Sequence, residues 1–108
     1  SRTASVMLRA EFANPQHRLL PGGNVTVHYV GVEYDTGEEF DSSWNRGETI
    51  EFPLRGLIQG WQDGIPGMKV GGRRELVIPP HLAYGPAGGG HFLSGKTLIF
   101  IIDLVAVG

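Results

Sequence analysis

The chain has 108 residues, a formal net charge of −2 and a hydrophobic content of 41%, which fits one globular domain with a single core. Such a charge gives no support to nucleic-acid binding or to a membrane-surface role, and no apolar run approaches the length of a membrane helix. Because the chain contains no Cys, disulfides and thiol chemistry are excluded.

Alternation of apolar and polar residues, the pattern of half-buried strands, recurs along the chain. It is clearest where Val25, Val27 and Tyr29 alternate with polar residues. Turn-forming residues at 35–37 favour a hairpin there. The predicted strands, in chain order, cover residues 6–12, 25–29, 39–42, 49–52, 73–78 and 97–107, with a loop over 43–47 and the last strand in the middle of the sheet.

One segment, from Leu57 to Ile65, predicts a helix. Leu57, Ile58, Trp61 and Ile65 fall on one helical face, and Pro66-Gly67 ends the helix. A helix this short is marginal in water, so it must lie against the strands. The sequence therefore predicts an α+β fold, with a five- to six-stranded twisted antiparallel sheet wrapped around one short helix.

Residues 79–95 form a long Gly-rich connection without periodicity, and such loops are usually functional. Residues Gly90–Thr97 (GHFLSGKT) match the phosphate-binding P-loop pattern letter for letter. That motif needs a strand before it and a helix after it, because the loop and the helix N-terminus together hold the phosphates. Here a loop precedes and a predicted strand follows, so we reject a nucleotide site.

No pairing of a nucleophile with a base stands out, and the four His residues lack metal-ligand spacing. The aromatic residues are spread over several elements: Tyr29, Phe40, Phe52, Trp61, Tyr84, Phe92 and Phe100. All could be core, which we favour for Phe52, or they could line a pocket, since Tyr and Trp carry polar groups that need partners. Asp41 either begins a turn or points inward to bond Tyr29 or Arg46.

Several blocks of the sequence, in order and well spaced, resemble the FKBP family of peptidyl-prolyl cis–trans isomerases. These blocks are Val27–Gly31, Phe40–Ser43, Ile58–Trp61, Gly67–Gly71, Ile78–Pro80, Ala83–Gly85 and Thr97–Phe100. The resemblance covers about residues 23–107. We therefore assign residues 1–22 to an N-terminal extension with an edge strand, and residues 23–108 to the isomerase domain.

The resemblance implies a pocket between the sheet and the helix. Trp61 would form its floor, and Tyr29, Phe40 and Phe100 its walls. Asp41 would be a buried carboxylate with Arg46 beside it. The backbone N–H of Ile58 and the hydroxyl of Tyr84 would be offered to a ligand.

The rim of this pocket departs from the family pattern at three places. Ile50 stands where an aromatic residue is common, the segment 53–57 is about two residues short, and residues 91–94 replace apolar residues followed by two prolines. We expect Ile50, Leu57, Phe92 and Arg46 to contact the substrate.

The function implied is peptidyl-prolyl isomerisation that assists protein folding. Rotation about the peptide bond has a barrier of about 18–20 kcal/mol. A twisted amide is less polar than a planar one, so a dry aromatic pocket would favour it, without a cofactor. The alternative is a weakly catalytic peptide-binding or chaperone module on the same fold. The intact aromatic set favours the enzyme, whereas the altered loops favour the alternative.

The expected partners are polypeptides containing X-Pro bonds and macrolides of the rapamycin or tacrolimus type. We expect a monomer, with no metal and no nucleic-acid, nucleotide or membrane partner. Because the chain begins at Ser1 rather than Met, we expect a processed product or one domain of a longer protein. The compartment is left open, with the cytoplasm favoured.

Overall fold

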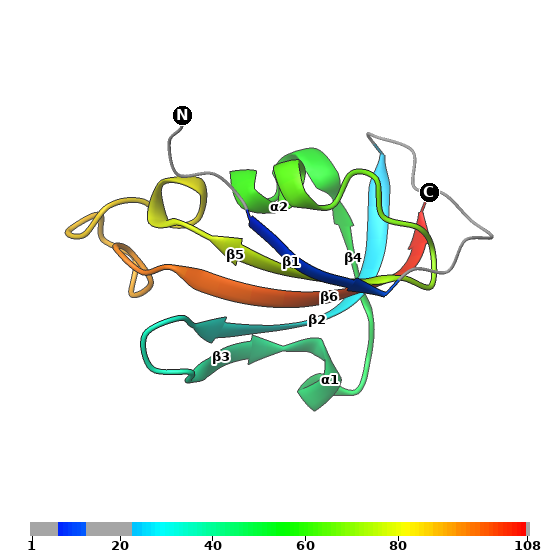
Figure 1. Cartoon of the computed structure of the whole chain (residues 1–108), viewed down its shortest axis with the longest axis horizontal. Helices are drawn as coiled ribbons and strands as arrows, with labels where there is room; N and C mark the ends of the chain where they lie inside the picture. Colours follow the sequence, from blue (N-terminus) through cyan, green and yellow to red (C-terminus); the bar gives the residue numbers. More distant parts are fainter. Residues whose placement is uncertain (1–6, 13–22, 108) are drawn as a thin grey trace.

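A twisted antiparallel sheet with helical segments against it forms the molecule (Figure 1). The structure, a computed structural model, describes residues 7–12 and 23–107. The strands are β1 (Met7–Phe12), β2 (Asn24–Glu33), β3 (Glu39–Ser42), β4 (Ile50–Pro53), β5 (Arg73–Ile78) and β6 (Leu98–Val107). The helices are α1 (Ser43–Arg46) and α2 (Gln59–Gly64), with 3₁₀ turns η1 (Leu54–Gly56) and η2 (Pro80–Leu82). The predicted α+β class is confirmed.

The strands lie in the order β1-β5-β6-β2-β3, and β4 also pairs with β2. Both β3 and β4 use the same edge of β2: Val30 pairs with Ser42 of β3, and Val27 pairs with Ile50 of β4. The described part of the chain therefore has six strands in a sheet that is five strands wide. β6 lies between β5 and β2, which confirms the prediction of a central strand.

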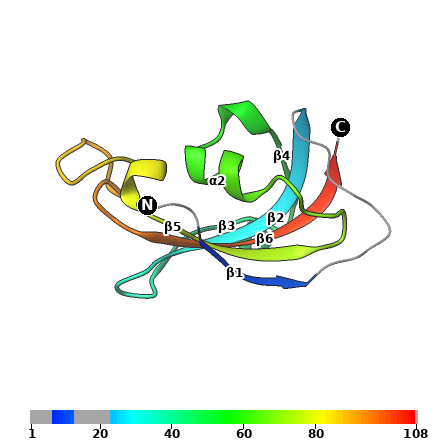
Figure 2. The same cartoon turned by 45° about the horizontal axis from the view of Figure 1, so that its top comes forward.

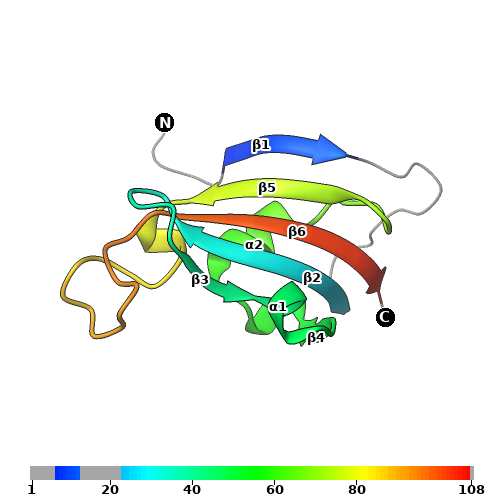
Figure 3. The same cartoon turned by 90° about the horizontal axis from the view of Figure 1, so that it is seen from below.

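The core lies between the sheet and α2. Along β2, Val25, Val27 and Tyr29 are buried while their neighbours are partly exposed, as the alternation predicts. Even-numbered residues of β6 from Leu98 to Leu104 are buried in the same way. Figure 2 shows α2 inside the curve of the sheet, and Figure 3 shows the strands in front of α2 from the other side.

Two glycines let α2 approach the sheet closely. A Cβ atom on Gly60 would lie 2.5 Å from Ile78 Cγ2, and one on Gly64 would lie 2.5 Å from Leu76 Cδ1. Glycine disfavours helices by about 1 kcal/mol relative to Ala, so tertiary packing rather than propensity places this helix. The helix begins at Gln59, two residues later than predicted, because Ile58 has extended backbone angles (φ −59°, ψ 153°).

The sequence did not predict α1, which occupies the expected loop at 43–47. It is a single turn, too short to show helical periodicity. Ser42 Oγ accepts a hydrogen bond from the Asn45 N–H at 3.2 Å, and Gly47 ends the turn with φ 75°. These capping residues were the available signal.

The rejected P-loop string leads into a strand, as expected. Turns cover 92–95, and β6 begins at Leu98, so no helix follows Lys96. Among the helices that the structure describes, none is long and apolar enough to cross a membrane.

Candidate functional site

A pocket of about 240 Å³ opens between the sheet and the segment that enters α2. Its lining comes from β2, β3, β4, β6, α2 and the segments around η1 and η2. The lining residues are Tyr29, Phe40, Asp41, Phe52, Leu57, Ile58, Trp61, Tyr84 and Phe100. Pockets for drug-sized ligands have volumes of roughly 300–1,000 Å³. This pocket therefore suits a group the size of a single ring, with the rest of a ligand lying across its mouth.

Trp61 is the centre of the aromatic cluster. The residue is 3% exposed, and the rings of Tyr29, Phe52 and Phe100 each meet the indole ring nearly at right angles. The centroid distances are 5.2, 5.8 and 5.2 Å respectively. Edge-to-face pairs contribute about 0.5–1.5 kcal/mol each beyond burial. The floor is therefore held rigidly from three sides.

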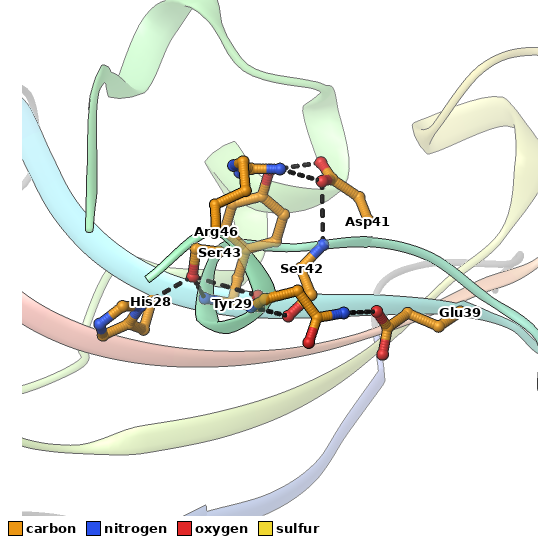
Figure 4. A network of polar contacts seen from close by, with 8 residues as sticks. His28, Tyr29, Glu39, Asp41, Ser42, Ser43 and Arg46 are labelled. Carbon is orange, nitrogen blue, oxygen red and sulfur yellow. Dashed lines mark hydrogen bonds and ion pairs between the residues drawn. The ribbon is translucent and has the colours of Figure 1, made fainter. Parts of the chain in front are cut away.

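A polar group lies along one wall of this otherwise largely apolar pocket (Figure 4). The Tyr29 hydroxyl donates to Asp41 Oδ2, and Arg46 Nη1 donates to Asp41 Oδ1 at 2.5 Å. Arg46 Nη2 also donates to the Tyr29 hydroxyl at 3.2 Å. Asp41 thus points inward to both partners considered for it, and its side chain remains 37% exposed.

The contacts within this group shift the pKa values of Asp41 and Tyr29. Partial burial raises the pKa of Asp41, but hydrogen bonds from Tyr29 and Arg46 outweigh it and hold the pKa below the ordinary 3.8. Burial, together with the bond to Asp41, raises the pKa of Tyr29 above 10.0. At neutral pH the group therefore consists of a carboxylate and a neutral phenol that line the pocket, with a guanidinium behind them.

Three donors at the pocket have no partner among residues 7–12 and 23–107: the buried Trp61 Nε1–H, the Ile58 N–H and the Tyr84 hydroxyl. The Ile58 N–H precedes the first turn of α2 and makes no hydrogen bond there, although the Ile58 carbonyl accepts from Trp61 N. The Tyr84 hydroxyl is likewise without a bond in that part of the chain. Burial and the charge of Asp41 raise the pKa of Tyr84, so it stays a neutral donor at pH 7.

The rim beyond Tyr84 carries a stack of three rings. His91 lies 4.1 Å from Tyr84 and 4.9 Å from Phe92, centroid to centroid, with nearly parallel planes. Phe92 is 71% exposed and is not among the lining residues. The expected substrate contact of Phe92 is therefore not visible in the pocket itself.

The structure brings together eight of the eleven residues expected at the site. Arg46 stands outside the lining and acts through Asp41 and Tyr29, while Ile50 packs against the core in β4. The sequence favours a core position for Phe52, and the structure places it both against the core and in the pocket lining. Among the described residues, no group of three or more His, Asp or Glu side chains could hold a metal ion.

Residues 16–105 match the family model described as FKBP-type peptidyl-prolyl cis-trans isomerase. The chain belongs to this family. The match spans most of the 108 residues, and it agrees with the sheet, the short α2 and the aromatic pocket found above. The domain is therefore an FKBP-type peptidyl-prolyl cis–trans isomerase.

Individual relatives agree with this assignment. A "Probable FK506-binding protein" of Corynebacterium glutamicum is 73% identical over 86 residues, covering 80% of this chain and 73% of that protein. The crystal structure of FkpA from Escherichia coli superposes with a TM-score of 0.77 at 39% identity, covering 94% of this chain and 46% of FkpA. AtFKBP13 also gives 0.77, at 33% identity, covering 95% of this chain and 91% of that chain.

Proposed function

We propose that the FKBP domain isomerises X-Pro bonds in polypeptides at the pocket above Trp61. The observation that carries the proposal is the combination of an aromatic floor with one ionised wall. A proline ring placed on Trp61 would fit within a pocket of about 240 Å³, with the flanking peptide across the mouth. Dispersion and burial hold the ring, and the amide lies where water is excluded.

Catalysis then requires the pocket to bind the twisted amide better than the planar one. In the twisted amide the carbonyl loses resonance and polarity, so it loses less by leaving water for the aromatic walls. The Ile58 N–H and the Tyr84 hydroxyl hold a carbonyl of the bound peptide. Asp41 complements the amide electrostatically, and Tyr29 and Arg46 keep its carboxylate in place.

NMR exchange spectroscopy on a set of X-Pro peptides tests this proposal directly. We expect faster cis–trans exchange at micromolar protein, with apolar X preferred. Phe40→Ala, which removes a wall, should slow exchange, whereas Phe92→Ala, which removes an exposed ring, should not. No acceleration by the wild-type domain would favour the weakly catalytic binding or chaperone module. A second assay, the slow phase of a proline-limited refolding reaction, checks the same point on a protein substrate.

We also propose that the pocket binds macrolides of the rapamycin and tacrolimus (FK506) type. The support is the name of the Corynebacterium relative together with the intact floor and walls. A ring of the ligand would lie on Trp61, so titration followed by Trp fluorescence reports binding. Competition between the macrolide and an X-Pro peptide shows whether both use the pocket. We further propose that the domain acts as a monomer, which sedimentation analysis checks.

A further inference from the structure

The shared edge of β2 has a gap at His28 and Tyr29. β3 pairs with β2 only as far as Val30, and β4 resumes the pairing at Val27. Between these strands the chain leaves the sheet to form α1. The backbone N–H and carbonyl of Tyr29 face this gap, and buried backbone groups need partners.

A side chain fills the gap. The Tyr29 N–H donates to Ser43 Oγ at 2.6 Å, and Ser43 Oγ lies 3.2 Å from the Tyr29 carbonyl oxygen, to which it donates. Ser43 Oγ also lies 2.9 Å from His28 Nδ1. Ser43 is fully buried at 0% exposure, and Figure 4 shows it between His28 and Tyr29. Its hydroxyl thus bonds Tyr29 as an adjacent strand would.

The bonding capacity of the hydroxyl fixes the direction of each bond. A Ser hydroxyl has one donor and two acceptor positions. Donation to the Tyr29 carbonyl uses the proton, and the Tyr29 N–H uses one acceptor position, so His28 must donate from Nδ1. Neutral His28 is therefore the Nδ1–H tautomer. All three capacities of Ser43 are then used without conflict.

We infer that Ser43 is a positioning residue for the pocket, acting through Tyr29. It follows Asp41 by two residues and precedes Arg46 by three, so its bonds tie the segment bearing both groups to the backbone of Tyr29. This fixes the Tyr29 hydroxyl against Asp41 and the Tyr29 ring against Trp61. The inference deepens the proposed function and rests on it.

Ser43→Ala tests the inference. The variant leaves the Tyr29 N–H without its acceptor, so we expect kcat/KM for an X-Pro peptide to fall by about tenfold, within the range that slight misplacement produces. Leu104→Val is the control, since Leu104 is 1% exposed in β6 and does not line the pocket. It should lower the melting temperature while keeping turnover. Wild-type turnover in Ser43→Ala, measured well below its melting temperature, would overturn the inference.

Two NMR readouts separate this inference from the proposed function, because neither requires turnover. Hydrogen exchange of the Tyr29 amide should accelerate in Ser43→Ala and stay slow in Leu104→Val. The ¹⁵N shifts of neutral His28 should show a protonated Nδ1 in the wild type. A protonated Nε2 instead, or an unchanged Tyr29 amide in Ser43→Ala, would overturn the inference. If these readouts hold while the wild type lacks turnover, the proposed function fails and the role of Ser43 in placing Tyr29 stands.

Discussion

Tyr29 stands edge-on to Trp61, with ring centroids 5.2 Å apart and planes at 82°. The hydroxyl of the same Tyr29 donates to Asp41. One residue therefore joins the apolar floor of the pocket to its ionised wall. A substitution that disturbs either contact of Tyr29 should therefore alter how the pocket binds the substrate amide. Much of the remaining core does not line the pocket and supports only the fold.

Asp41→Ala should lower turnover more than stability. Asp41 lines the pocket, so loss of its charge beside the substrate amide should lower kcat/KM about 10- to 100-fold, which corresponds to roughly 1.4–2.8 kcal/mol of transition-state stabilisation. The effect on folding is smaller, because the Asp41 and Arg46 side chains are 37% and 42% exposed and solvent screens the pair. Peptide exchange rates and thermal melts measure both effects. Unchanged turnover with a clear drop in melting temperature would make Asp41 a turn residue only.

The contribution of Asp41 to stability should depend on pH in the acid range. Hydrogen bonds hold the folded-state pKa of Asp41 below 3.8, so the unfolded chain takes up this proton at higher pH than the folded chain. The contribution is therefore complete above the ordinary pKa and is lost as pH falls through the folded-state pKa. In urea melts, the difference in free energy of unfolding between wild type and Asp41→Asn should be constant from pH 7 to about pH 4 and then shrink towards pH 2. A difference that stays constant throughout or widens on acidification would contradict the shift.

Gly31→Ala should distort the pocket by displacing two of its aromatic walls, Phe40 and Phe100. A Cβ atom at Gly31 would lie 2.5 Å from Phe40 Cζ and 2.8 Å from Phe100 Cε1, so both rings must move. Overpacking of this kind costs about 1–3 kcal/mol, and we expect turnover to fall as well. In the matched control Gly56→Ala, the Cβ atom would meet only Pro53 Cγ, at 3.4 Å. If both variants behave alike in melts and exchange assays, close packing at Gly31 does not shape the pocket.

The domain should not bind ATP or GTP at Gly90–Thr97. Lys96 Nζ pairs with Glu33 Oε1 at 3.2 Å, and the string leads into β6 rather than a helix, so no helix dipole faces a phosphate. Calorimetry with magnesium and millimolar nucleotide should give no saturable heat. Saturable binding that Lys96→Ala abolishes would reverse this conclusion.

Elements with a clear period could be predicted from the sequence, whereas short irregular ones could not. The alternation of Val25, Val27 and Tyr29 with polar residues predicts β2, because alternate residues of a strand face the core. α1 has only four residues, so no period exists to detect. Its side chains nevertheless set the polar wall, since Arg46 bonds Asp41 and Ser43 bonds Tyr29.

Phe52 shows why the pocket was harder to predict than the fold. It is half-buried in β4, packs against Trp61 at 5.8 Å and also lines the pocket. Core and pocket lie on the same side of the sheet, so the strand pattern assigns Phe52 to that side without separating the two. Phe92 could not be placed from the sequence for a different reason. It lies in a Gly-rich loop without periodicity, where the pattern does not indicate whether a side chain is buried, and the structure shows it exposed and stacked on His91.

The last prediction concerns the rim and its effect on macrolide affinity. We expect binding of rapamycin or tacrolimus, but weaker than in a chimera whose residues 88–96 are replaced by a loop of apolar residues followed by two prolines. Burial of one apolar side chain is worth roughly 1.5–3 kcal/mol, so one missing rim contact lowers affinity by about one to two orders of magnitude.

The Phe92→Ala variant shows whether the Phe92 ring itself contacts a bound macrolide at this rim. Phe92 is 71% exposed, stacks on His91 and does not line the pocket, so removal of its ring should leave macrolide affinity nearly unchanged. A large loss on removal would mean that Phe92 closes over the ligand and replaces the contact. Trp61 fluorescence provides the readout for all three proteins, because a ligand on the pocket floor covers that ring. Equal affinity of the wild type and the loop chimera would show that this loop does not limit binding.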